Sequence, residues 1–245
     1  MQKVFALKTR LRAVRDQRSF AQIDALPVLL CLLLGVFTRV SSYLDLAQQT
    51  QRRRWRRLCG LKTPVGDDLF GYVTERLDAE DLRQDLAGCV KTLKQNKALQ
   101  SCKINGLLFL SLDANEHFAS RSRCCPTCCQ RQVRQSLWVW AASAKLDGYP
   151  ARVIYQGGHR RWGIENKAFN ELTQGYHLEH CYHHEPASML AQMLMLLWGF
   201  LLFNAFAQLQ SKLVVLGKIT AKALAQQLNL ALEEDLPWEQ WFHSG

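Results

Sequence analysis

Two acidic residues, Asp113 and Glu165, stand where the sequence could hold metal ions. The continuous apolar run at 107–112 predicts a buried strand that ends on Asp113. Residues 161–174 space their apolar side chains in an irregular helical stripe, with Glu165 in its early turns. A strand carboxylate facing a helix carboxylate can share Mg²⁺ or Mn²⁺, and two such ions about 4 Å apart can hold the attacking and leaving oxygens of a phosphodiester. The pair therefore predicts metal-dependent phosphodiester chemistry, which requires at least one further ligand.

The sequence around these residues carries a family resemblance. It includes Trp138 and Trp140 in a W-x-W pair, GHRRWGIENKAFNEL at 158–172 and HLEHCYHHEPA at 177–187. This block resembles the C-terminal part of bacterial DDE transposases of insertion sequences, and Arg161 with Glu165 matches their R-x-x-x-E signature. The segment LDANEHFASRSRCCPTC at 112–128 resembles the first-aspartate block of the same family, with Asp-Ala-Asn-Glu in place of the usual Asp-Gly-His-Glu. The likeness covers most of residues 20–208.

The resemblance implies a fold and an activity. The expected fold is α/β, with an incomplete RNase H-like core, a helical N-terminal domain and long C-terminal helices. The expected domains are a basic helical domain at 1–100, a truncated catalytic core at 101–210 and a helical tail at 211–245. In this family three acidic residues hold two metal ions for DNA cleavage and strand transfer, so Asp113 and Glu165 are expected as catalytic ligands of Mg²⁺ or Mn²⁺.

The second catalytic aspartate has no good match in this chain. The sole Asp between Asp113 and Glu165 is Asp147, and it lies in a turn signal at 146–150. We therefore predict an internal deletion near residues 131–135. Either the chain is a decayed transposase that cannot hold both metals, or Asp147, Glu116 or a partner chain supplies the missing ligand.

Positive charge is concentrated near the N-terminus. The net charge is +10, and residues 1–60 hold twelve Lys and Arg against three Asp and Glu. The densest cluster suits phosphate neutralisation with some stacking on Trp55, and its members are Arg52, Arg53, Arg54, Arg56 and Arg57. Arg160 and Arg161, beside His159, are expected near the phosphates of the cleaved strand. The alternative for both groups is a solvated helix surface.

Helical patterns dominate the N-terminal region. Residues 25–39 predict a mostly apolar helix, and residues 64–77 and 79–96 predict two more, the last capped at Asp78. Farther along, Tyr155 is expected to pack on a half-buried strand, while Trp162 and Phe169 are expected in the core.

One apolar segment raises a membrane alternative. Residues 189–207 carry no charge and are long enough to cross a bilayer. In the resemblance this segment is a core helix that packs across the sheet. No cleavable signal peptide is evident, so we expect a cytoplasmic bacterial protein that does not reside in the membrane.

Cysteine and histidine residues could form a zinc site. Cys125 and Cys128 have knuckle spacing within CCPTCC, and His177, His180, Cys181, His183 and His184 crowd a later block. Only one knuckle is present, so the alternative is reduced cytosolic thiols and histidines at a helix start.

Three functional hypotheses follow. The first is a transposase-family protein with impaired catalysis, which binds transposon ends and pairs with itself or with a full-length transposase. The second is a DNA-binding-only regulator or relic of a transposase. The third is a small membrane protein with a C-terminal span.

Overall fold

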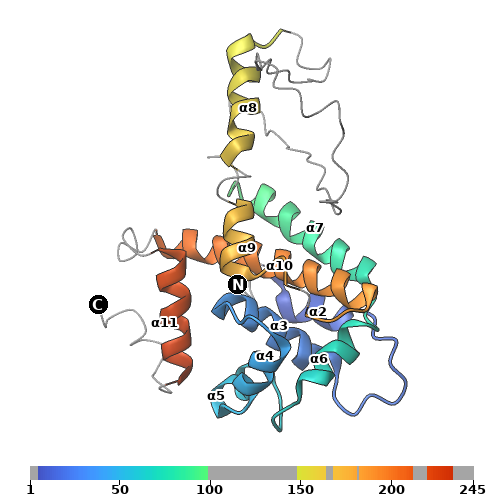
Figure 1. Ribbon diagram of the computed structural model, residues 1–245. Coiled ribbons are helices and arrows are strands. Elements are labelled where there is room, and N and C mark those ends of the chain that lie inside the picture. The colour runs from blue at the N-terminus through green and yellow to red at the C-terminus, as the bar shows by residue number, and fades with distance from the viewer. Residues whose placement is uncertain (1–4, 99–147, 164–167, 181, 212–219, 234–245) are drawn as a thin grey trace, which may run out of the picture. The chain divides into compact units, whose positions relative to one another are not determined.

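The computed structural model describes residues 5–98, 148–163, 168–180, 182–211 and 220–233. These residues form helices joined by short connections (Figure 1). The helices are α2 (Leu7–Ala13), α3 (Ala25–Thr38), α4 (Tyr43–Thr50), α5 (Arg53–Cys59), α6 (Asp67–Thr74), α7 (Ala79–Gln95), α8 (Ala151–Gly163), α9 (Asn170–Tyr176), α10 (Pro186–Ser211) and α11 (Ala221–Glu233).

The chain divides into two compact units. One comprises residues 1–98 together with 169–245, and the other comprises residues 99–168. Among the described helices only α8 belongs to the second unit. The first unit is called the helical unit below.

Helix α3 lies at the centre of the helical unit. Its Val28, Leu29 and Leu32 are at most 2% exposed, and each buried side chain of this size stabilises the fold by about 1.5–3 kcal/mol. The helix ends at Arg39, whose backbone has φ of 58° and whose N–H bonds to the carbonyls of Gly35 and Val36. Helices α2, α5, α10 and α11 all pack against α3.

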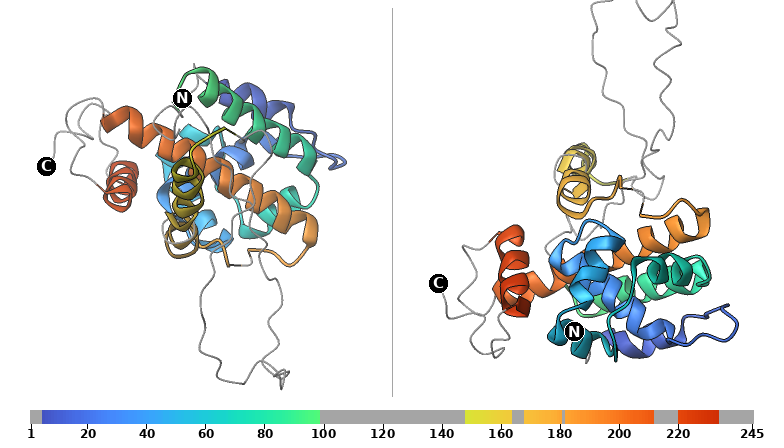
Figure 2. Two further views of the ribbon diagram at one scale, coloured as in Figure 1. Left: turned by 90° about the horizontal axis from the view of Figure 1, so that it is seen from above. Right: turned by 60° about the horizontal axis from the view of Figure 1, so that its bottom comes forward.

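Helix α10 supplies the other main core surface. It crosses the helical unit in contact with α3, α6 and α7, as the two views of Figure 2 show. Trp198 and Leu202 are fully buried, and the Trp198 indole Nε1 donates to Cys89 Sγ on α7 at 3.2 Å. The backbones of α3 and α10 approach closely at Gly199, where an added Cβ would lie 2.5 Å from a methyl carbon of Val36.

A buried polar cluster fixes the N-terminal half of α10. Thr74 Oγ1 on α6 lies 2.6 Å from Ser188 Oγ on α10. Tyr43 Oη on α4 donates to Gln192 Oε1 at 3.3 Å and lies 3.3 Å from Thr74 Oγ1. Because buried hydroxyl and amide groups are costly without partners, these contacts favour one register of α10 on α4 and α6.

Helix α10 also meets the length and composition of a membrane span. Residues 186–207 have a mean hydropathy of 1.8, and 56% of the apolar window is buried within the protein. Helices α3 and α4, bent by 106°, would count as a second span only if taken together.

The expected α/β fold with an RNase H-like core is wrong. The described residues contain no strand, and their one β-type contact is an isolated antiparallel bridge between Asp16 and Leu77. The predicted strand at 107–113 and the pair Trp138 and Trp140 lie outside the described residues. Helix α10, expected to cross a sheet, packs on helices instead.

The region before Glu165 also differs from expectation. Residues 151–163 form helix α8, so Tyr155 lies on a helix and is 53% exposed rather than packed on a strand. The predicted helix at 161–174 is observed as the end of α8 and as α9, with residues 164–167 outside the description. Phe169, expected in the core, is 43% exposed, while the side chain of Trp162 is not described.

Three of the N-terminal helices correspond to predicted segments, although α6 is shorter than the segment predicted for it. The segments 25–39, 64–77 and 79–96 correspond to α3, α6 and α7. The predicted cap is confirmed, because the Asp78 carboxylate accepts hydrogen bonds from the backbone N–H groups of Glu80 and Asp81 at 2.9 and 3.4 Å. Local signals were sufficient here because caps and helical periodicity act over a few residues.

We expect Asp78→Ala to lower the free energy of unfolding by about 1 kcal/mol, because two N–H groups of the first turn of α7 lose their acceptor. Urea denaturation followed by circular dichroism measures this change. Asp24→Ala is the matched control, since Asp24 occupies the N-cap of α3 without a side-chain capping bond, and we expect it to stay within about 0.5 kcal/mol of wild type. Equal effects of the two substitutions would contradict the role of Asp78.

Candidate nucleic-acid interface

The arginine cluster predicted to bind DNA forms the helix α5. Arg52 is its N-cap, and the helix ends at Gly60, whose φ of 81° is a conformation that glycine adopts without strain. Trp55 and Cys59, four residues apart, form the buried face of this short helix. The arginines therefore occupy the remaining faces.

The expected stacking of bases on Trp55 is wrong. Trp55 is 0% exposed and belongs to the main hydrophobic core. Its indole ring anchors α5 on the helical unit, so it cannot receive a nucleic-acid base on its face. Stacking was expected because an aromatic residue lies between arginines in the sequence. The same pattern also fits an amphipathic helix whose aromatic side chain packs into the core.

Three of the five arginines hold other helices in place. Arg56 Nη1 donates to the carbonyls of Thr50 and Gln51, at 2.8 and 2.7 Å, and so satisfies acceptors at the end of α4. Arg54 Nη1 donates to the carbonyl of Ala231 in the last turn of α11 at 2.9 Å.

Arg52 also reaches α11. Its guanidinium bonds to Gln49 Oε1 at 2.6 Å and forms an ion pair with Glu233 at 2.9 Å, where both side chains are partly exposed. Positive side chains at a helix C-terminus interact favourably with the helix dipole. Part of the arginine cluster therefore stabilises the fold. The run of arginines in the sequence did not indicate this role.

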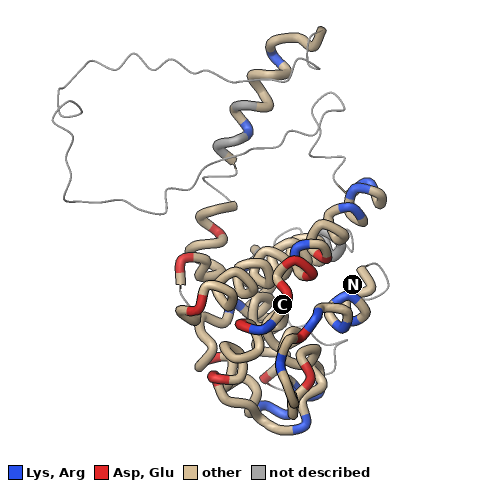
Figure 3. Tube along the Cα trace, turned by 90° about the vertical axis from the view of Figure 1, so that its right-hand side faces the viewer, with Lys and Arg blue, Asp and Glu red and all other residues tan. Residues whose placement is uncertain are grey.

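Arg53 and Arg57 are the exposed members of the cluster. They lie four residues apart and therefore on one face of α5. Residues 52–60 contain five arginines and no Asp or Glu, so this segment is strongly basic, and Glu233 forms an ion pair with Arg52. Elsewhere on the helical unit, Lys and Arg lie in several separate places along the trace, and so do Asp and Glu (Figure 3).

The predicted catalytic residues cannot be placed. Asp113, Glu165, Glu116 and Asp147 lie outside the described residues, as do Cys125 and Cys128 of the predicted zinc knuckle. The metal site proposed from these residues therefore stays a prediction.

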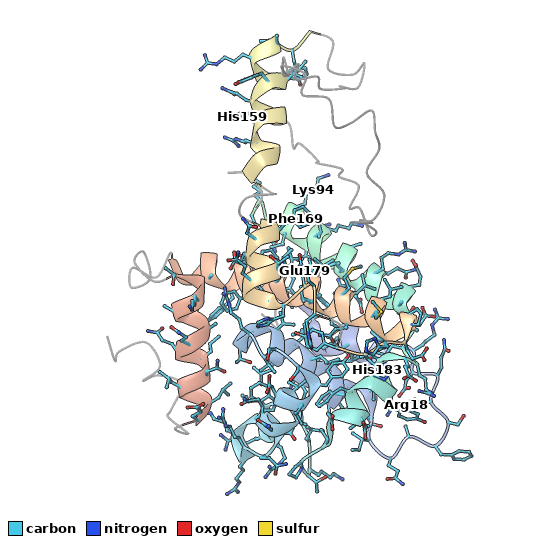
Figure 4. All side chains as sticks on the ribbon, in the orientation of Figure 1. Arg18, Lys94, His159, Phe169, Glu179 and His183 are labelled. Atoms are coloured by element: carbon cyan, nitrogen blue, oxygen red, sulfur yellow. The ribbon has the colours of Figure 1, made fainter. Side chains whose placement is uncertain are left out.

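The basic residues near the signature lie on α8. Arg160 and His159 are exposed, and the His159 ring stacks on Tyr155 with centroids 5.6 Å apart (Figure 4). The side chain of Arg161 is not described. An exposed Arg and His on one helix are compatible with the predicted phosphate contacts and with the alternative of a solvated surface.

The histidine block is spread over separate contacts. His177 ends α9 with φ of 56°, His180 packs its ring edge-on against Tyr182, and His183 Nε2 lies 3.4 Å from Glu75 Oε1 on α6 (Figure 4). Within the described part of the chain, no three His, Cys, Asp or Glu residues are close enough together to hold a metal ion. The zinc hypothesis depends on cysteines outside that part and stays a prediction.

A second basic feature, at Arg39, was missed by the sequence analysis. Arg39 Nη2 donates to Glu171 Oε1 on α9 at 2.9 Å, and its guanidinium carbon lies 4.6 Å from the centroid of the Tyr176 ring. Burial raises the pKa of Tyr176 to about 12, so the phenol stays neutral beneath the cation. Arg39 follows an apolar helix and meets partners far along the chain, so no local pattern indicated this site.

Three comparisons with known proteins found no match for this chain. It matches no family model, no curated protein and no solved structure.

Proposed function

We propose that the protein binds double-stranded DNA in DNA transposition, as a member of the insertion-sequence transposases in which strand cleavage and strand transfer are impaired. The observation that carries the proposal is the basic sequence of α5, where Arg53 and Arg57 are exposed beside three arginines that bond to other helices. Anchored guanidinium groups lose little side-chain entropy when a phosphate approaches, and exposed ones are accessible to the DNA backbone.

The transposase assignment rests on the sequence signature. Arg161 and Glu165 carry the R-x-x-x-E pattern, and Asp113 stands in a segment similar to the first-aspartate block. The absence of a match for the second aspartate in the sequence favours binding over cleavage. The partners proposed are transposon ends and a second copy of this chain or of a full-length transposase.

Binding that depends on the backbone phosphates has a measurable salt signature. We expect the double variant Arg53→Gln/Arg57→Gln to bind a short duplex more weakly. The slope of log K against log salt concentration should fall in magnitude by about 2, because two phosphate contacts are lost. Fluorescence anisotropy across a salt series measures both quantities.

The control removes the same net charge from another surface. Arg83 and Lys91 are exposed on α7, and Arg83 already pairs with Glu80. Arg83→Gln/Lys91→Gln should leave the salt slope at its wild-type value. The proposal for α5 is wrong if the two double variants weaken binding equally or if wild type binds no duplex.

Catalysis is tested separately with plasmid DNA. Wild type, Asp113→Ala and Glu165→Ala are incubated with Mg²⁺ and then with Mn²⁺ at matched salt, and nicked and joined products are quantified. We expect little or no nicking by any of the three, with DNA binding retained. Strong metal-dependent nicking that both substitutions abolish would overturn the proposed impairment and require a third ligand.

A second candidate function is that of a small membrane protein, and helix α10 is the observation that favours it. Its residues 186–207 satisfy the length and hydropathy of a span. Sedimentation of cell membranes at high pH tests this candidate. Retention of the chain in the membrane pellet would support a span, and its release would support α10 as the core helix of the helical unit.

A further inference from the structure

A pocket of about 430 Å³ opens on the helical unit where the C-terminal end of α3 meets α9 and the start of α11. Ligand pockets commonly have volumes of about 300–1,000 Å³. The polar side chains that line it are Arg39, Asn170, Glu171, Gln174, His177 and Lys222. It is separate from the arginine cluster of α5.

The lining of this pocket carries an excess of positive charge. Among the described residues that line it, Glu171 is the one acidic residue, and Arg39 neutralises it through the 2.9 Å ion pair. Lys222 is exposed and makes no hydrogen bond or ion pair with any described residue. The described lining therefore keeps one positive charge, that of Lys222.

The guanidinium of Arg39 is held rigidly at the wall of the pocket. It lies over Tyr176 and against Gly175, where an added Cβ would be 2.7 Å from Nη1. Its side chain is 16% exposed, and Nε is buried with no hydrogen-bond partner in the part of the chain that the structure describes. A partly exposed cation that these contacts hold in place can bind an anion without much reordering.

Helix α11 adds to the positive potential. Lys222 lies in its first turn, where Thr220 Oγ1 accepts the N–H of Ala223 at 3.1 Å. The N-terminal end of a helix of this length carries a partial positive charge that favours anions. The charge of Lys222 and the helix end therefore act in the same direction.

We propose that this pocket binds a phosphate group, with Lys222 and Arg39 as its charged ligands and with His177 and the amide side chains of Asn170 and Gln174 as further contacts. A phosphate offers several acceptor oxygens to these converging donors, which suits it better than a single carboxylate. The phosphate belongs either to a DNA backbone or to a free nucleotide. The first source rests on the proposed function, whereas the second does not.

Binding of small phosphates tests the pocket directly. The full chain is titrated with inorganic phosphate and with deoxyadenosine 5′-monophosphate by calorimetry. We expect Lys222→Gln to weaken the binding of both by about fivefold or more, because among the described lining residues it removes the one charge without a partner. Lys91→Gln, which removes an exposed lysine of α7, is the matched control and should leave both affinities unchanged.

A variant that binds phosphate more tightly than wild type cannot be explained by damage to the fold. Glu171→Gln removes the acidic charge and releases Arg39 from its ion pair, so it should tighten phosphate binding. Three results would overturn the proposal. Lys222→Gln could bind both phosphates with wild-type affinity, Lys91→Gln could lower the affinity as much as Lys222→Gln does, or Glu171→Gln could lower the affinity.

Duplex DNA then separates the two sources. A loss of DNA affinity in Lys222→Gln, together with the loss for mononucleotide, assigns the pocket to a backbone phosphate. Unchanged DNA affinity with weakened mononucleotide binding assigns it to a free nucleotide. A third outcome is that wild type binds no DNA while Lys222→Gln still binds the mononucleotide more weakly than wild type. In that case the proposed function is wrong and the phosphate site in the pocket is supported.

Discussion

Replacing Trp198 with alanine is expected to lower the free energy of unfolding by about 3–5 kcal/mol, the usual cost of deleting a fully buried aromatic side chain. Trp198 is 0% exposed, lies on α10 within the main core, and donates its indole N–H to Cys89 Sγ. The substitution leaves a large cavity between α10 and α7 and removes the hydrogen bond that joins them. Urea denaturation of the full chain measures the loss.

Met189→Ala provides the control on the same helix. Met189 is 49% exposed, so the free energy of unfolding should stay within about 0.5 kcal/mol of wild type. A small effect of Trp198→Ala, similar to that of Met189→Ala, would show that α10 does not pack as the core helix of the helical unit. That outcome would favour the membrane candidate.

The sequence predicted the helices whose signals are local. Helices α3, α6 and α7 follow from apolar periodicity and from the capping residue Asp78, all of which act within one or two turns. The sequence correctly predicted α10 as a helix, but it did not predict that α10 packs on other helices. An apolar surface does not specify whether a sheet or helices cover it.

The predicted sheet shows where this kind of reasoning fails. Val153, Ile154 and Tyr155 are residue types enriched in strands, yet they lie in α8. Short apolar runs are ambiguous between a strand and a buried helix, and the alternation of apolar positions around Tyr155 favoured the strand. The described residues form helices and no strand. The α/β fold that the family resemblance implied is therefore wrong.

The candidate site was predictable in its charge but not in its contacts. The run of arginines indicated a basic surface, whereas the burial of Trp55 and the bonds from Arg54 and Arg56 to backbone carbonyls depend on helices far apart in sequence. The pocket at Arg39 and Lys222 was missed for the same reason. Such sites form only when residues far apart in the sequence pack together, and no local sequence pattern indicates them.

Replacing Asp16 with asparagine is expected to lower the free energy of unfolding by about 3 kcal/mol at neutral pH, because it leaves a buried guanidinium without its counter-charge. The side chain of Arg18 is 1% exposed, and its Nη2 bonds to Asp16 Oδ2 at 2.6 Å and to the carbonyl of Ile23 at 2.8 Å. The pair closes the connection between α2 and α3 beside the bridge from Asp16 to Leu77. Chemical denaturation at pH 7 measures the loss.

The pH dependence provides an independent check on this pair. The hydrogen bond from Arg18 lowers the pKa of Asp16 in the folded protein, so its contribution is complete above the unfolded pKa of about 4 and is lost as the pH falls through the folded value. The difference in stability between wild type and Asp16→Asn should therefore shrink below about pH 4. Asp81→Asn is the matched control, since Asp81 pairs with Arg15, whose side chain is 68% exposed, and its effect at neutral pH should be much smaller. Equal losses in the two variants, or a difference that does not change with pH, would show that the buried pair does not stabilise the fold as proposed.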